Sequence, residues 1–291
     1  MNFFALVEEI GTVKTARIPV EQDLQNELTT LFNAQEQSFF ANDPDEVPFS
    51  PSHTPDSSEI AYIDNVIIPK VIVESVAVPL QQDQLKLTGK TVPKIKAIFG
   101  GESDTKGQRI LFQAFERRQI LDASGLWLIP SRSTYKRLKS PGLMIDTRLS
   151  AVYRDERLYF HSFFTARRVL DLSSYYREAT DDDLKKFAKE ETVALESPTT
   201  LLDNADEWVR RRVALIRDSK VMKNVAPQKI ATEGKRYGLK IRTKKIDGQD
   251  RILFPDDKKE LKTLLRFLEE NYYTSGLTGD RFVANSKRPI K

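Results

Sequence analysis

Cysteine is absent from the 291 residues, and histidine occurs only twice, as His53 and His161. The lack of cysteine excludes disulfides and thiolate metal sites, and it is typical of proteins from a reducing compartment. Two histidines leave little material for a histidine-based metal site or a catalytic triad. We therefore predict no catalytic residue, no metal ligand and no cofactor.

Long apolar runs are also missing. A membrane-spanning helix needs about 18 to 20 consecutive apolar residues, and the longest candidate, residues 66–80, is broken by two prolines and two charged residues. The N-terminus lacks a basic region and meets Glu8 and Glu9 too early for a signal peptide. We expect a cytoplasmic protein without direct membrane insertion, so any contact with a membrane should be through a partner.

Apolar periodicity predicts an α+β fold. In the N-terminal part we expect strands at 3–19, 94–99 and 109–115, a helix at 21–38, a proline-rich loop at 41–58, two short strands within 60–80 split by Pro69, and a hairpin at 149–160. This part, residues 1–200, should form a largely antiparallel mixed sheet with helices.

Residues 201–291 should form a smaller domain of helices and a hairpin, beyond a boundary at Ser197–Thr200. We expect one helix capped by Asp203 or Asn204, a second from Pro227 to a stop at Gly234, and a third opened by Pro255. Strands at 237–242 and 251–254 should flank a turn at Asp247-Gly248. This order resembles a winged helix, although that likeness is an analogy only.

Charge is distributed unevenly along the chain. Residues 203–291 hold 22 Lys and Arg against 13 Asp and Glu, whereas residues 1–202 hold 24 against 29. A basic part beside an acidic part is typical of proteins that bind polyanions. Lys and Arg would neutralise phosphates, while Ser and Asn would help to fix register. The predicted DNA-binding residues are Arg210, Arg211, Lys240, Arg242, Lys244, Lys258, Lys259, Lys262, Arg281, Asn285, Ser286, Lys287 and Arg288.

The C-terminal sequence resembles a known family. The matching segments are 254–262 (FPDDKKELK), 264–268 (LLRFL), Tyr272-Tyr273, Leu277-Thr278-Gly279 and Asn285–Arg288, with weaker matches at 112–115, 142–153 and 214–219. They resemble the KwaB-like family, the cytosolic subunit of the bacterial Kiwa anti-phage system. The resemblance implies a DNA-binding protein that works beside a membrane-embedded KwaA-like subunit, and it implies no established catalytic residues.

Two other functions stay open at this point. Glu233-Gly234-Lys235 has a Glu-x-Lys form that occurs in metal-dependent nucleases, although so short a pattern is common in a highly charged chain. Alternatively, the acidic residues 1–202 could dock a basic face of a membrane protein or form a homodimer, which would make the chain an interaction adapter. We predict a homodimer that binds DNA without strong sequence preference.

Overall fold

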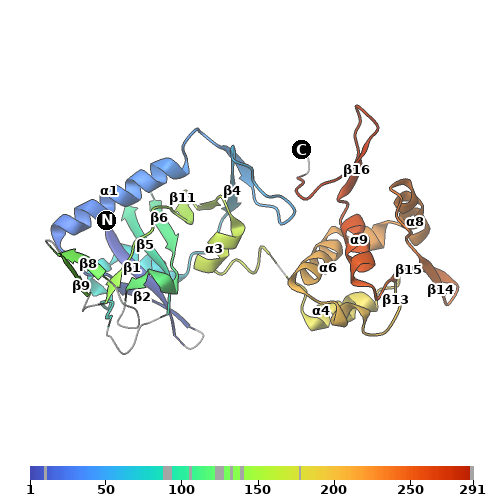
Figure 1. Cartoon of the computed structure of the whole chain (residues 1–291), viewed down its shortest axis with the longest axis horizontal. Coiled ribbons are helices and arrows are strands. Elements are labelled where there is room, and N and C mark those ends of the chain that lie inside the picture. Colours follow the sequence, from blue (N-terminus) through green and yellow to red (C-terminus); the bar gives the residue numbers. More distant parts are fainter. Residues whose placement is uncertain are drawn as a thin grey trace. The chain divides into compact units, whose positions relative to one another are not determined.

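The computed structural model describes residues 1–9, 12–87, 94–104, 107–121, 128–131, 134–137, 141–176 and 178–288. These residues form two compact units. Unit 1 contains Met1–Phe49 and Pro55–Leu172, and unit 2 contains Ser50–Thr54 and Ser173–Lys291. Both units appear in Figure 1.

Unit 1 is built on an eight-stranded sheet in the order β2-β1-β5-β6-β11-β12-β4-β3. Its strands are β1 (Asn2–Glu9), β2 (Thr12–Arg17), β3 (Asp45–Pro48), β4 (Glu59–Asp64), β5 (Lys94–Asp104), β6 (Gly107–Ala114), β11 (Ala151–Arg154) and β12 (Arg157–Phe160). All neighbouring strands are antiparallel except β3 and β4. The expected α+β class with a largely antiparallel sheet is therefore confirmed.

Helices cover both faces of this sheet. Phe3 packs against Phe32 of α1 (Gln22–Phe39), with ring centroids 4.9 Å apart. A Cβ at Gly100 would meet the Phe3 ring, whereas one at the next residue, Gly101, would meet Val76 of α2 (Lys70–Ala77) at 2.9 Å. Because successive residues of a strand face opposite sides, α1 and α2 lie on opposite faces. Residues 3–7 are buried throughout for this reason.

Short elements complete unit 1. They are α3 (Phe163–Val169), the 3₁₀ turns η1 (Pro79–Gln81) and η2 (Arg117–Gln119), and the strand pairs β7 (Ile120–Leu121) with β10 (Gly142–Leu143) and β8 (Leu128–Ser131) with β9 (Thr134–Arg137). The expected hairpin at 149–160 is present as β11 and β12, with Asp155 and Glu156 both at positive φ, as a type I′ turn requires.

The prediction of two strands within 60–80 is half wrong. The first strand exists as β4, but Lys70–Ala77 forms the helix α2. Pro69 stands at the N-cap, where its fixed φ suits a helix start. Ile72 and Val76 are buried, so packing overrides the β-propensity of this Val- and Ile-rich segment. The proline-rich loop also contains the short strand β3.

Unit 2 packs helices around a three-stranded sheet in the order β13-β15-β14. Its elements are α4 (Asp181–Ala188), β13 (Val193–Leu195), α5 (Thr200–Asp203), α6 (Glu207–Ser219), α7 (Val221–Asn224), α8 (Pro227–Arg236), β14 (Thr243–Ile246), β15 (Gln249–Phe254), α9 (Lys258–Leu268), β16 (Tyr272–Thr274) and β17 (Arg281–Val283). Because β13 pairs in parallel with β15, the expected boundary between 200 and 201 falls inside this unit.

Several helices and strands of unit 2 begin or end at other residues than expected. Asp206, rather than Asp203 or Asn204, caps α6, since its carboxylate accepts a hydrogen bond from the Val209 N–H at 2.9 Å. Gly234 lies inside α8, and α9 begins at Lys258 behind the cap Asp257. Residues 237–242 are not a strand, although the Asp247-Gly248 turn is present between β14 and β15. The winged-helix likeness stays a prediction.

Among the residues that the structure describes, no helix is both long and apolar enough to cross a membrane.

Candidate nucleic-acid interface

The predicted cations of unit 2 fall into separate groups. One surrounds a pocket beside the N-terminal turns of α9, another lies on the other side of that helix and on α6, and a third follows β17. Whether a group can bind phosphate depends on whether acids of the same unit already neutralise it. The three groups differ in this respect.

The first group lines a pocket of about 820 Å³. Its walls come from the segment 239–242, β15, the first turns of α9, and Glu196, which follows β13. Lys240, Arg242 and Lys259 supply the positive charges, while Leu239, Ile241, Leu253, Pro255 and Leu264 supply apolar surface. A cavity of this size lies within the range that holds small ligands, ~300–1,000 Å³.

Strand register adds Lys244 to this group. The Leu253 N–H donates to the Arg242 carbonyl at 2.9 Å, and Lys244 lies opposite Arg251. Side chains two residues apart on a strand share a face, as do directly opposed residues. Lys244 and Arg251 therefore lie on the same sheet face as Leu253, which lines the pocket. This part of the predicted cationic face is brought together, even though 237–242 is not a strand.

A close contact fixes the segment that carries Lys240. Gly234 is buried in α8, and a Cβ there would lie 2.5 Å from the Ile241 side chain. The Leu239 N–H donates to the Gly234 carbonyl at 2.9 Å, and Gly238 has a φ of +75°. Glycine is needed at 234 for close approach and at 238 for its left-handed backbone. Gly234 therefore serves the packing of α8 against Ile241 and does not end the helix.

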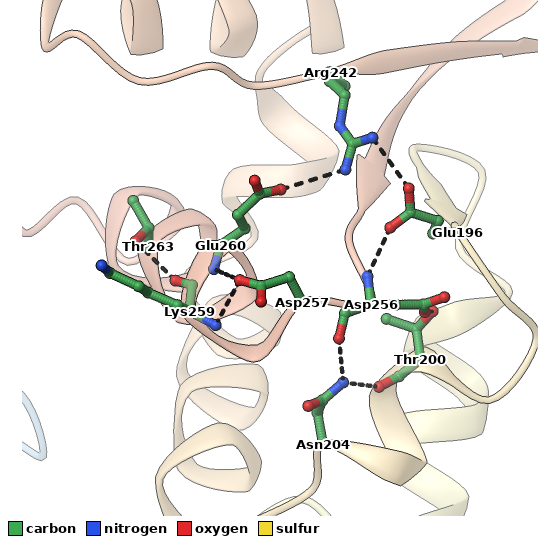
Figure 2. A network of polar contacts seen from close by, with 9 residues as sticks. All are labelled: Glu196, Thr200, Asn204, Arg242, Asp256, Asp257, Lys259, Glu260 and Thr263. Carbon is green, nitrogen blue, oxygen red and sulfur yellow. Dashed lines mark hydrogen bonds and ion pairs between the residues drawn. The ribbon is translucent and has the colours of Figure 1, made fainter.

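The acids of the pocket are already engaged (Figure 2). Arg242 donates to Glu196 at 3.0 Å and to Glu260 at 3.4 Å, so two carboxylates hold its guanidinium. Glu196 also accepts from the Asp256 N–H at 2.8 Å, while Asp257 accepts from the N–H groups of Lys259 and Glu260. Each carboxylate of the wall therefore has an internal partner.

Behind the pocket, hydrogen bonds tie the start of α9 to α5. Asn204 donates to the carbonyls of Thr200 and Asp256. Hydrogen bonds from the hydroxyls of Thr200 and, next, Ser197 lower the pKa of the Asp256 carboxyl. This acid therefore stays ionised as part of the scaffold.

Lys240, Lys244 and Lys259 have no such partner. Within the described ranges none of the three makes an ion pair, and all three are exposed. Figure 2 shows the Lys259 ammonium directed away from the acids of the network. The face around the pocket consequently carries three positive charges that are not matched internally.

Lys258 and Lys262 lie on the opposite side of α9, and both bind Asp206, at 3.1 and 2.8 Å. Burial tends to raise the pKa of this carboxyl, but hydrogen bonds from Lys262, the Val209 N–H and Lys258 outweigh it, and the pKa falls to about 2. The three lysines of α9 that were predicted to bind DNA are thus divided between two sides of the helix.

The arginines of α6 are largely structural. Arg210 binds Asp181 at 2.6 Å, and Arg212 binds the buried Glu269. Arg212 has only 12% of its side chain exposed. Sequence analysis also missed Trp208, whose ring lies near Arg212, Lys262 and Arg266. Arg211 packs against the Tyr176 ring and donates to the Pro51 carbonyl.

The C-terminal group is held in place and is not a flexible tip. The Lys287 N–H donates to the Ser52 carbonyl, and the Ser286 hydroxyl accepts from the Thr54 N–H at 2.9 Å. The Lys287 ammonium donates to the Glu269 carbonyl, and burial lowers its pKa. Arg281, Asn285 and Arg288 are exposed. No sequence signal predicted that residues 50–54 would contact this segment.

Glu233 and the two histidines, the residues considered for nuclease or metal chemistry, each have a partner. Glu233 binds Arg236, one turn later in α8, at 3.0 Å. His53 lies 3.2 Å from the Ser286 hydroxyl, and His161 lies 2.9 Å from the Phe39 carbonyl. In the described part of the chain, no three Asp, Glu or His side chains gather as possible metal ligands.

The sequence model of the Kiwa protein KwaB-like family matches residues 104–278. This range covers more than half of the chain and includes every residue that lines the pocket. The chain belongs to the KwaB-like family. It is accordingly a component of the Kiwa anti-phage defence system. The comparisons found no match among curated proteins and none among solved structures.

Proposed function

We propose that unit 2 binds duplex DNA through phosphate contacts, as the DNA-binding subunit of a Kiwa-type defence complex. A membrane-embedded KwaA-like partner would hold the complex at the inner membrane, and the chain would act as a homodimer. In this proposal the chain binds DNA without strong sequence preference and catalyses no reaction of its own.

The observation that carries the proposal is the set of unmatched cations around the pocket, Lys240, Lys244 and Lys259. A phosphate that binds a lysine already paired with an acid must first displace that acid. A phosphate that binds an unpaired, exposed lysine displaces only water and counterions, and the released counterions drive association. Arg242 and Arg251 lie on the same face and add positive potential, although each has an acid nearby.

The composition of this face favours binding without sequence preference. Lysine presents a compact charge on a flexible stem, so it imposes less geometric selectivity than the planar groups of Arg, Asn or Gln that read base edges. The Arg242 guanidinium is already held by Glu196 and Glu260. Contacts from the lysines to phosphates would position the duplex and carry no sequence information.

The test is the salt dependence of binding to a duplex of arbitrary sequence, measured by fluorescence anisotropy. Log affinity should fall by about 0.9 per phosphate contact for each tenfold rise in salt. The variant K240Q/K244Q/K259Q should reduce this slope by about 2.7. The matched control K185Q/K186Q/K189Q removes Lys185 and Lys186 of α4 and its C-cap residue Lys189, which are exposed and lie outside the pocket. Equal slopes for the two variants would refute the assignment.

The proposed partner is tested separately. Co-expression of the chain with a KwaA-like membrane protein, followed by detergent extraction, should recover both proteins together. Light scattering of the purified chain should give twice the monomer mass. If the membrane protein is retained but DNA is not bound at low salt, the adapter function replaces the DNA-binding function.

A further inference from the structure

The pocket beside α9 has features that a simple phosphate-binding surface does not need. Lysines on a convex surface would suffice to hold a duplex backbone. Here the lysines stand at the rim of a cavity of about 820 Å³ with aliphatic walls. A rigid duplex cannot enter such a cavity, but one unpaired nucleotide can.

The charges of the pocket favour an anionic ligand. The wall contains three acids, Glu196, Asp257 and Glu260, but each accepts hydrogen bonds from Arg242 or from backbone N–H groups. Lys240 and Lys259 make no ion pair within the described residues. The formal charges of the lining residues sum to zero, but the three acids already accept hydrogen bonds from within unit 2. The ammonium groups of Lys240 and Lys259 are therefore the charged groups that an anionic ligand can contact without displacing an internal partner.

The walls favour a flat, partly apolar group attached to that anion. Leu239, Leu253 and Leu264 line the cavity, and Leu264 is buried. Figure 2 shows the Arg242 guanidinium held between Glu196 and Glu260. A guanidinium that is fixed in this way loses little entropy when a nucleobase stacks on its plane. A base on Arg242 and the leucines, with its phosphate at Lys240 or Lys259, would satisfy both parts of the pocket.

We propose that this pocket binds a single unpaired nucleotide through its base and its phosphate. The nucleotide could belong to the single-stranded end of a DNA molecule or be a free nucleoside monophosphate. The first source deepens the function proposed above and rests on it, whereas the second does not. In the first case, unit 2 would prefer DNA with free, frayed or tailed ends over closed duplex.

The sharpest test is a variant in which a larger side chain fills the pocket. Thr263 lines the cavity from α9, and its hydroxyl donates to the Lys259 carbonyl at 2.9 Å. The substitution Thr263→Trp would occupy the cavity without changing any charge. Thr232 of α8 is the matched control, since it is an exposed helical threonine whose hydroxyl donates to the Gln228 carbonyl at 2.8 Å, outside the pocket.

The experiment compares three probes: a duplex with short single-stranded 5′-phosphorylated tails, a covalently closed dumbbell of the same duplex, and deoxyadenosine monophosphate. We expect the natural chain to bind the tailed duplex about tenfold more tightly than the dumbbell, the factor for one stacked base. Thr263→Trp should abolish this preference and leave dumbbell affinity unchanged, while Thr232→Trp should alter neither. Binding of the monophosphate that Thr263→Trp abolishes, without binding of either DNA, would support the pocket while refuting the DNA-binding function.

Equal affinity of the natural chain for both DNAs, with no binding of the monophosphate, would overturn the pocket proposal and leave DNA binding intact. An equal loss of preference in Thr232→Trp would also overturn it. Circular dichroism monitors folding of both variants. If Thr263→Trp does not fold, the comparison of the three probes on the natural chain decides the matter.

Discussion

The two sides of α9 carry lysines only one residue apart in sequence, yet these lysines have different surroundings. Lys258 and Lys262 share the carboxylate of Asp206, which also caps α6. Lys259 lines the pocket and makes no ion pair within the described residues. A count of cations therefore overstates the charge that is available to a ligand. The helical period decides which lysines meet an acid of the same fold.

The cations that are paired with acids can be tested first at a buried ion pair, that of Arg212 with Glu269. Replacing Glu269 by Gln would leave the Arg212 guanidinium, only 12% exposed, without its counter-charge. Removing one member of a buried pair costs about 3–5 kcal/mol. We expect a loss of this size in the unfolding free energy of unit 2, measured by urea titration.

The double variant R212M/E269M serves as its control, because removal of both charges leaves neither unpaired. It should recover most of the lost stability. If Glu269→Gln unfolds at the same urea concentration as the natural chain, the pair has no structural role, and Arg212 would be available for a ligand after all.

The ion pairs of Asp206 with Lys258 and Lys262 are tested second. Its pKa of about 2 lies below the 3.8 of an ordinary aspartate, so its ionised form stabilises the fold. This stability is complete above about pH 4 and is lost as pH falls through 2. Asp206→Asn keeps a good cap but removes the charge, and it should cost ~1 kcal/mol at pH 7 after allowance for solvent screening.

The difference between Asp206→Asn and the natural chain should shrink toward pH 2, where both side chains are uncharged. Denaturant titrations at pH 7 and at acidic pH measure it. The salt slope for DNA should be unchanged in Asp206→Asn, because the two lysines that it releases lie across the helix from the pocket. A pH-independent difference in stability would contradict the ion pairs.

The smallest effect is expected at the C-terminal segment. Lys287 already donates to the Glu269 carbonyl, and its pKa is lowered by burial. Lys287→Gln should therefore leave the salt slope of DNA binding unchanged within error. A reduction by about 0.9, measured by the same anisotropy titration, would show that this lysine meets a phosphate.

The sequence predicted those features that depend on local pattern. Alternating apolar residues located β1 and β5, and helical spacing located α1 and α9. The resemblance to the KwaB-like family, stated from a few C-terminal segments, was confirmed by the family match.

Features that depend on distant residues could not be predicted. Val- and Ile-rich Lys70–Ala77 became a helix because the sheet buries Ile72 and Val76. The pairing of β13 with β15 moved the division between the two units to residues 172 and 173. Asp206 neutralises lysines 52 and 56 residues away in the chain, and no local pattern reports that contact. The acids that neutralise a cation come from tertiary structure.

The most direct test compares two double variants. One lacks two lysines that line the pocket, and the other lacks two lysines on the opposite side of α9. The variants K240Q/K259Q and K258Q/K262Q lose equal charge within one small part of unit 2. Their salt slopes for one DNA duplex should differ. We predict a slope reduced by about 1.8 for K240Q/K259Q and an unchanged slope for K258Q/K262Q. Equal reductions, or a larger one for K258Q/K262Q, would contradict the claim that unpaired cations around the pocket bind the phosphates.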